Sequence, residues 1–262
     1  MRVAAGGLAV AVLAIATTSY ADSWVLEASG ARVEASGSAA SDKAGGDSGP
    51  IKKGHDEIVL RGGSAMLRDL APLLGDAIQR DCPRNVNANL IAVGGDGNEA
   101  ARMSFAWAIV TELSLPAFDG SAGPASEVTL KLEPQFPKRV FQKGPVAKPA
   151  AGPEWKKSGF KLAIDGLDAS KIKALGELKI TQAPSGGACG AATISDLTFS
   201  TSDASALTGW RDAKNGVLDY VAADGSPLLK VKLNGLKKKS QAAEGGTTKV
   251  TASIEAVALG RK

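Results

Sequence analysis

The order of short apolar segments along this chain occurs twice, and this repetition constrains the fold more than any single motif does. An aromatic residue opens a short strand that ends in glycine at 24–30 and again at 160–166. A second apolar strand follows at 57–60 and at 196–199. Short β segments resemble one another by chance, so the argument depends on the shared order, which indicates one structural unit present in two copies.

A helix is expected after the second strand of the first half. Leu67, Leu70, Leu74 and Ile78 recur there at helical spacing. Pro72 lies inside this run and is expected to kink or split the helix, because proline removes a backbone donor.

The matching helix of the second half is shorter. Ser202 or Asp203 provides an N-cap, and Leu207 and Trp210 form part of its apolar side. The Asn-Gly pair at 215–216 ends it.

Each helix is followed by the pattern of a hairpin and a closing strand. The Asp-Gly pairs at 96–97 and 224–225 supply the positive φ angles that a tight turn requires. Apolar and polar residues alternate in the closing strands, which predicts one buried and one solvated face. The expected hairpin strands are 87–93, 102–111, 217–222 and 228–233, and the expected closing strands are 127–133 and 249–255.

This order predicts a mainly β fold with minor α content, made of two tandem small β-barrel or sandwich domains, each with one flanking helix. The segment 143–158 is rich in Pro, Gly and Lys and is interpreted as a linker. It places the first domain at 22–142 and the second at 159–262. A Ser-, Gly-, Ala- and Asp-rich stretch, 36–54, is predicted to be a long surface loop of the first domain.

The first 21 residues have the pattern of a secretory signal peptide. Arg2 is followed by an unbroken run of small and aliphatic residues to Ala16, and small residues stand at Ser19 and Ala21. A buried helix or an uncleaved anchor is the alternative interpretation. We expect cleavage after Ala21, a mature protein that begins at Asp22, a secreted or periplasmic location, and membrane contact only through the signal peptide.

Export affects the interpretation of the two cysteines, Cys82 and Cys189. In an oxidising compartment they form one disulfide or remain two buried small side chains, and their spacing does not decide between these alternatives.

Composition argues against most chemistry. One histidine and two cysteines exclude multi-histidine and four-cysteine metal sites, and 5% aromatic residues argue against a nucleic-acid stacking surface. His55 beside Asp56, with Cys189 in a Gly-rich loop, is the best available pattern for an enzyme, but an exposed histidine and a disulfide-bonded or idle cysteine explain both residues and are the preferred interpretation. We therefore expect no catalytic residues, no cofactor and no metal.

The only basic run is Lys237, Lys238 and Lys239. It is expected in a loop between the second hairpin and the last strand, where it either contacts a polyanion or is simply solvated. Acidic side chains outnumber basic ones in 22–142, and the reverse holds in 159–262. Such halves can attract one another within or between chains.

The second half resembles the tail tube proteins of contractile phages, which are similar in turn to the haemolysin-coregulated tube protein of type VI secretion. The resemblance covers about 159–262, with a weaker echo over 22–142. It rests on order and spacing: the strand 160–166, the strand 197–200, the Leu207–Trp210 pair and the hairpin 218–233 around Asp224 and Gly225.

This resemblance implies a small β-barrel with a flanking helix and assembly into hexameric rings. An export signal and two copies in one chain are departures from the family pattern. We therefore expect an exported structural protein that associates with itself or with another tube-like protein, with three chains supplying the six domains of a ring. The alternative is a monomeric extracellular or periplasmic binding module for a surface polysaccharide or protein.

Overall fold

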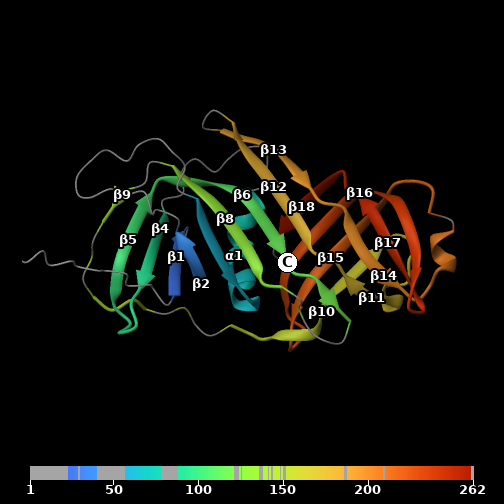
Figure 1. The fold of residues 1–262 in the computed structure, drawn as a ribbon, viewed down its shortest axis with the longest axis horizontal. Helices are drawn as coiled ribbons and strands as arrows, with labels where there is room; N and C mark the ends of the chain where they lie inside the picture. The colour runs from blue at the N-terminus through green and yellow to red at the C-terminus, as the bar shows by residue number, and fades with distance from the viewer. Residues whose placement is uncertain are drawn as a thin grey trace, which may run out of the picture.

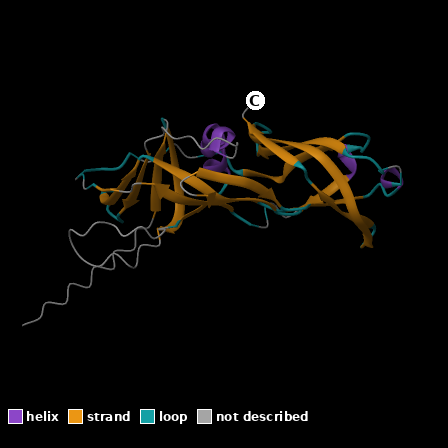
Figure 2. Cartoon of the chain, turned by 90° about the horizontal axis from the view of Figure 1, so that it is seen from above, coloured by secondary structure: helices purple, strands orange, loops and turns teal. Residues whose placement is uncertain are grey.

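The computed structural model of the chain is mainly β, as predicted, with two large antiparallel sheets and one α-helix among the described residues (Figure 1). Figure 2 shows the sheets along an elongated molecule, with the helix near its middle. The residues described are 23–28, 30–39, 57–77, 88–120, 124, 126–135, 138–140, 142, 144–147, 149, 152–185, 188–208 and 210–260.

The first sheet contains ten strands. In spatial order they are β13 (Ala188–Ile194), β12 (Leu178–Ser185), β6 (Trp107–Leu115), β8 (Val128–Gln135), β3 (Ile58–Gly62), β2 (Ala31–Ala39), β1 (Ser23–Ala28), β4 (Ala88–Val93), β5 (Glu99–Phe105) and β9 (Lys138–Arg139).

The second sheet is barrel-like, because Phe118 in its last strand packs on Phe160 in its first, with ring centroids 5.6 Å apart. In spatial order its strands are β10 (Trp155–Ile164), β15 (Lys214–Ala222), β16 (Pro227–Glu244), β17 (Thr247–Ser253), β14 (Leu197–Thr201), β11 (Ile172–Leu175) and β7 (Phe118–Asp119), and β18 (Ala256–Gly260) also pairs with β16.

The same strand pairings recur in the two halves. In the first half β1 pairs with β4, β4 with β5, and β3 with β8; in the second half β10 pairs with β15, β15 with β16, and β14 with β17. The register agrees too, since Leu26 lies opposite Leu90 and Leu162 lies opposite Leu218. The predicted repeat therefore has a counterpart in the hydrogen-bonding order of the strands.

One long strand of the second half corresponds to two strands of the first. The N-terminal part of β16 pairs with β15 and its C-terminal part pairs with β17. In the first half these pairings are divided, because β5 pairs with β4 and β6 pairs with β8. The short outer strands also correspond, since β9 pairs with β5 and β18 pairs with β16.

Helix α1 (Ser64–Ala77) forms where the leucine spacing predicts it, and Leu67, Leu70 and Leu74 are buried. The helix is not split at Pro72, which lies at an exposed position within it. Ile78 lies outside the described residues.

The predicted flanking α-helix of the second half is wrong, because only the 3-10 turn η2 (Ser205–Leu207) forms there. Ala204, and neither Ser202 nor Asp203, occupies the N-cap of this turn; Asp203, one residue earlier, accepts hydrogen bonds at Oδ1 from the backbone N–H groups of Ser205 and Ala206. Thr208 and Gly209 follow at once, and both are poor helix formers, so no further turn is added.

Two predicted loops contain strand instead. Residues 36–39, placed in the surface loop 36–54, belong to β2 and pair with β3; residues 40–54 lie outside the described part of the chain. Lys237, Lys238 and Lys239, predicted in a connecting loop, lie inside β16, because this strand continues past the hairpin to pair with β17.

The main hydrophobic core extends through both halves. The two sheets do not divide at 143–158, because strands from each half pair with the sheet of the other: β12 and β13 extend the first sheet, and β7 joins the second. The boundaries at 22–142 and 159–262 therefore mark two copies of a strand pattern, and the sheets are shared between them.

Candidate functional site

The contact between the halves begins at the edge of β6, where β12 adds as an antiparallel strand. Leu178 lies opposite Leu115, and Ile180 lies opposite Leu113. All four side chains are buried. Removing this apolar area from water stabilises the contact, at roughly 1.5–3 kcal/mol for each fully buried aliphatic side chain.

Charged groups flank this apolar contact. The Glu112 carboxylate lies 3.5 Å from Lys179 Nζ and 3.5 Å from Lys131 Nζ. Lys179 comes from the second half and Lys131 from the first, so one acidic group of β6 interacts with both halves. Further along β12, Gln182 Nε2 donates a hydrogen bond of 2.7 Å to the carbonyl of Gly190 in β13, which helps to hold the two strands together.

The first half makes the reciprocal contribution through β7. Phe118 and Asp119 pair with Leu175 and Ala174 of β11. The Phe118 ring lies among three aromatic rings of β10 and β15, with centroid distances of 5.4 Å to Trp155, at the end of the predicted linker, 5.6 Å to Phe160 and 6.1 Å to Tyr220. Phe118 meets Trp155 edge to face, at an interplanar angle of 74°, and is tilted against Phe160 and Tyr220. Edge-to-face aromatic pairs contribute beyond their buried area.

The exchange joins two different surfaces. The first half presents the edge of β6 and the strand β7, whereas the second half presents the hairpin β12–β13 and the edge of β11. A contact between unlike surfaces of repeated units is heterologous, so successive units joined by it are arranged head to tail.

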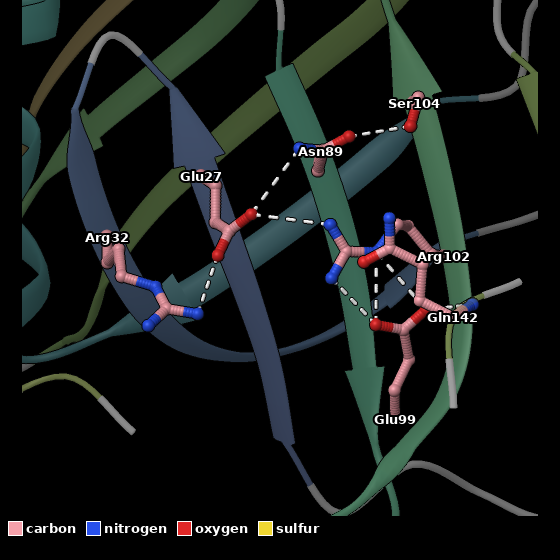
Figure 3. A network of polar contacts seen from close by, with 7 residues as sticks. All are labelled: Glu27, Arg32, Asn89, Glu99, Arg102, Ser104 and Gln142. Carbon is pink, nitrogen blue, oxygen red and sulfur yellow. Dashed lines mark hydrogen bonds and ion pairs between the residues drawn. The ribbon is translucent and has the colours of Figure 1, made fainter. Parts of the chain in front are cut away.

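A second feature is a polar network on the first sheet, shown in Figure 3. Arg102 donates to both carboxylate oxygens of Glu99, with Nη2 2.7 Å from Oε2, and the Glu99 side chain is only 3% exposed. Arg102 also faces Glu27 at 3.5 Å, and Glu27 pairs with Arg32 at 2.6 Å. Asn89 and Ser104 extend the network, since Asn89 donates to Glu27 and Ser104 donates to Asn89.

This network holds the start of the predicted linker. The backbone N–H of Gln142 donates to Glu99 Oε1 at 3.0 Å, and the Glu99 N–H donates to the Gly144 carbonyl at 3.0 Å. The Val146 N–H donates to the Gly97 carbonyl. The hydrogen bonds from Arg102, with that from Gln142, lower the pKa of Glu99 and keep it ionised. The network therefore has a positioning role, because its charges are already paired.

A cavity of about 1000 Å³ opens on the second sheet between β7, β10, β11 and β14. Its apolar wall includes Phe160, Leu162 and Phe199, and Lys161 and Lys249 are among the charged residues around it. Among the described residues, its lining contains no histidine or cysteine, and its polar side chains include Ser170, Ser200 and Thr247.

The predicted polyanion contact is largely occupied by partners within the chain. Lys238 Nζ donates to the Leu207 carbonyl at 2.8 Å and to Gln241 Oε1 at 2.9 Å, and Lys239 pairs with Asp196 at 2.8 Å. Lys237 is exposed. The register of β16 against β17 shifts between Lys238 and Ser240, so Lys239 is the extra residue of a β-bulge and regular alternation of side chains does not apply to the three lysines. Polyanion contact by these lysines stays a prediction.

The remaining candidates fall on or near residues outside the described part of the chain. Cys82 and His55 are outside the described residues, and only the backbone of Cys189 is described, in β13. The disulfide therefore stays a prediction.

The acidic turn at 96–99 is satisfied internally. Asp96 accepts hydrogen bonds from the side-chain and backbone nitrogens of Asn98, which lower its pKa. Within the described ranges, no group of three or more His, Cys, Asp or Glu residues is arranged to hold a metal.

Sequence reasoning missed the two segments that the halves exchange. The hairpin 178–194 carries a weak signal, because Leu178 and Ile180 alternate with polar residues and a Pro-Ser-Gly-Gly turn follows at 184–187. Nothing in the sequence of β7 marks so short a strand, and only its aromatic residue distinguishes it.

No protein family model matches the chain, and no curated protein matches it. In the part of the chain that is described, no helix combines the length and apolar character needed to cross a membrane.

Proposed function

We propose that this protein is an exported, non-catalytic structural subunit, similar to phage tail tube proteins, that assembles head to tail into rings or tubes. The observation that carries the proposal is the heterologous strand exchange between its two halves.

Because the two halves repeat the same strand order, the contact between them within one chain can also form between the halves of different chains. Each half has the same pairing order, and the contact joins one surface of the first half to a different surface of the second. If the same contact is made again, the second half of one chain meets the first half of the next. Heterologous contacts close into a ring or continue as a filament. Because each chain supplies two units, three chains supply the six units of a pseudo-hexameric ring.

Charge supports association of unlike halves. Acidic side chains exceed basic ones in 22–142, and basic side chains exceed acidic ones in 159–262. A first half therefore attracts a second half of another chain more than it attracts another first half.

The test is the mass of the mature protein in solution as its concentration rises. Sedimentation equilibrium or light scattering is expected to give a mass of three chains, and electron micrographs are expected to show rings. A chain that remains monomeric at high concentration contradicts the proposal and leaves the binding module as the surviving function. Export is tested separately, because N-terminal sequencing of the secreted form is expected to begin at Asp22.

A further inference from the structure

We infer that the outer edge of residues 240–244 in β16 accepts an antiparallel strand from the first half of a second copy of this chain. We call these residues the acceptor edge. The inference rests on the proposed self-assembly and adds to it the place where one chain meets the next.

The acceptor edge is the open part of an otherwise central strand. The N-terminal part of β16 is paired on both sides, by β15 and by β18. From Lys237 to Glu244 the strand pairs with β17. Among the described residues no strand pairs with its other side. An open edge presents a row of unpaired N–H and C=O groups, which is a template for another strand.

The first half shows what this edge accepts when it is covered. Strand β6 corresponds to this part of β16, because β6 pairs with β8 as the C-terminal part of β16 pairs with β17. The other side of β6 is paired with β12 from the neighbouring half. The same position in the repeated unit is therefore covered in one copy and open in the other.

Burial differs in the way this correspondence requires. Leu113 and Leu115 of β6 are both 0% exposed beneath the added strand. Residues 241–244 of β16 are all exposed. Residues 240–243 carry no charge and no proline, so the centre of this edge lacks two devices that block strand addition, whereas Glu244 ends the edge and a β-bulge between Lys238 and Ser240 precedes it.

The strand that pairs with the acceptor edge comes from a second copy of this chain. In the chain itself, the half that covers β6 is the adjoining half of the repeat. At the acceptor edge the adjoining half must belong to another chain, because the first half of the same chain already contacts the second half through β7. The excess of acidic side chains in 22–142 complements the exposed Lys237 and Lys249 near this edge.

The hairpin turn identifies the amide that faces outward. Gly245 and Gly246 have φ angles of 53° and 81°, as a two-residue primed turn requires. The pair Glu244–Thr247 closes this turn and is hydrogen-bonded. Bonded and non-bonded pairs alternate along an antiparallel ladder, so the next pair, Ala243–Thr248, directs its amides away from the hairpin. The N–H of Ala243 therefore points to the open side.

The test compares Ala243→Pro with Ala243→Val. Proline removes the outward N–H and adds bulk to the edge without removing a bond to β17, whereas valine keeps the N–H and suits a strand. We expect Ala243→Pro to weaken assembly by about tenfold or more in concentration, as loss of a backbone hydrogen bond with added steric bulk implies. Ala243→Val is expected to assemble as the wild type does. The far-ultraviolet circular dichroism and the melting temperature of each variant monitor its fold.

Three outcomes oppose the inference, and they can be distinguished. If the wild type assembles and Ala243→Pro assembles at the same concentration, the acceptor edge is wrong and self-assembly stands. If the wild type never assembles, the proposed function fails and the inference fails with it. Amide hydrogen exchange at residues 240–244 of the wild type provides a second test that needs no substitution. Protection at residues 240–244 is expected to rise with the mass of the particle, and unchanged protection in the assembled protein overturns the acceptor edge.

Discussion

At the scale of single residues, the most constrained side chain is Phe118. It comes from the first half, is 1% exposed, and contacts three aromatic rings of β10 and β15. Burial raises the pKa of the neighbouring Tyr220, which stays neutral in this cluster. The sequence marks Phe118 as apolar but cannot show that its partners lie in and beyond the predicted linker, because they are distant along the chain.

Phe118→Ala is expected to lower the free energy of unfolding by about 3–5 kcal/mol, the usual cost of removing a buried ring. Chemical denaturation measures this difference. Val140→Ala is the matched control, because Val140 is a large apolar side chain that is 38% exposed, and its loss is expected to change stability by less than about 0.5 kcal/mol. Equal effects of the two substitutions would contradict the placement of Phe118.

Glu99 gives stability a dependence on pH. Its pKa is lowered below the ordinary value of 4.5, so the unfolded chain binds a proton at this group at a higher pH than the folded chain does. Its contribution is present above pH 4.5 and is lost as the pH falls through the lower folded-state pKa. Glu99→Gln is expected to flatten the fall in stability below this pH, as measured by denaturation at a series of pH values. Glu127→Gln, at an exposed position, serves as the control. If the free energy of unfolding depends on pH in the same way in Glu99→Gln and in Glu127→Gln, the Glu99–Arg102 pair is contradicted.

At the scale of elements, the N-terminus of α1 is fastened to the chain that enters the second half. The Ser64 hydroxyl donates to the Pro153 carbonyl, and Gly152 lies against Ala65. The helix was predictable from its leucine spacing. The contact of its N-terminus with Pro153, 89 positions further along the chain, was not predictable, because nothing in the sequence around either residue indicates that the two lie close together.

A methyl group at Gly152 would overlap the Cβ and backbone of Ala65. Gly152→Ala is therefore expected to destabilise the protein by about 1–3 kcal/mol, the range for overpacked sites. Gly260→Ala is the control, since a Cβ at Gly260 meets nothing within 4 Å. Thermal denaturation compares the two variants, and an unchanged melting temperature for Gly152→Ala would show that α1 and this segment are not in contact.

Local signals predicted the elements whose partners are close in sequence. The hairpin β15–β16 forms around Asp224-Gly225, and Gly225 has a φ of 83°, as its turn requires. Strand β12 was missed because its partner β6 lies in the other half, and η2 was overestimated because two apolar residues suggested a helix that its following Gly209 does not support. Non-local pairing determines these elements, and periodicity within one segment does not report it.

At the scale of the whole molecule, each half lacks a piece that the other supplies. Separated from the second half, residues 22–142 would expose Leu113 and Leu115 at the edge of β6. Separated from the first, residues 159–262 would lose Phe118 from their aromatic cluster. The segment 143–158 marks the boundary between the two repeats. Because strands are exchanged across it, cutting the chain there is expected to lower the stability of both halves.

We expect the separately produced fragments 22–142 and 159–262 to melt at lower temperature than the full chain, and to recover part of the loss when they are mixed. Circular dichroism melting curves of each fragment and of the mixture test this expectation. A nicked full chain, cut only between the halves after folding, is the control for the cut itself. Fragment 159–262 melting with the midpoint of the full chain would show that the exchange contributes little.

The reciprocal exchange of β7 and β12–β13 also determines how a larger particle could come apart. A contact between segments of one polypeptide has a fixed effective concentration, which dilution of the sample does not change. A contact between separate polypeptides weakens as the sample is diluted. Any particle built from this protein would therefore open at alternate seams only, and its smallest fragment in dilute solution would be one intact chain carrying two joined units.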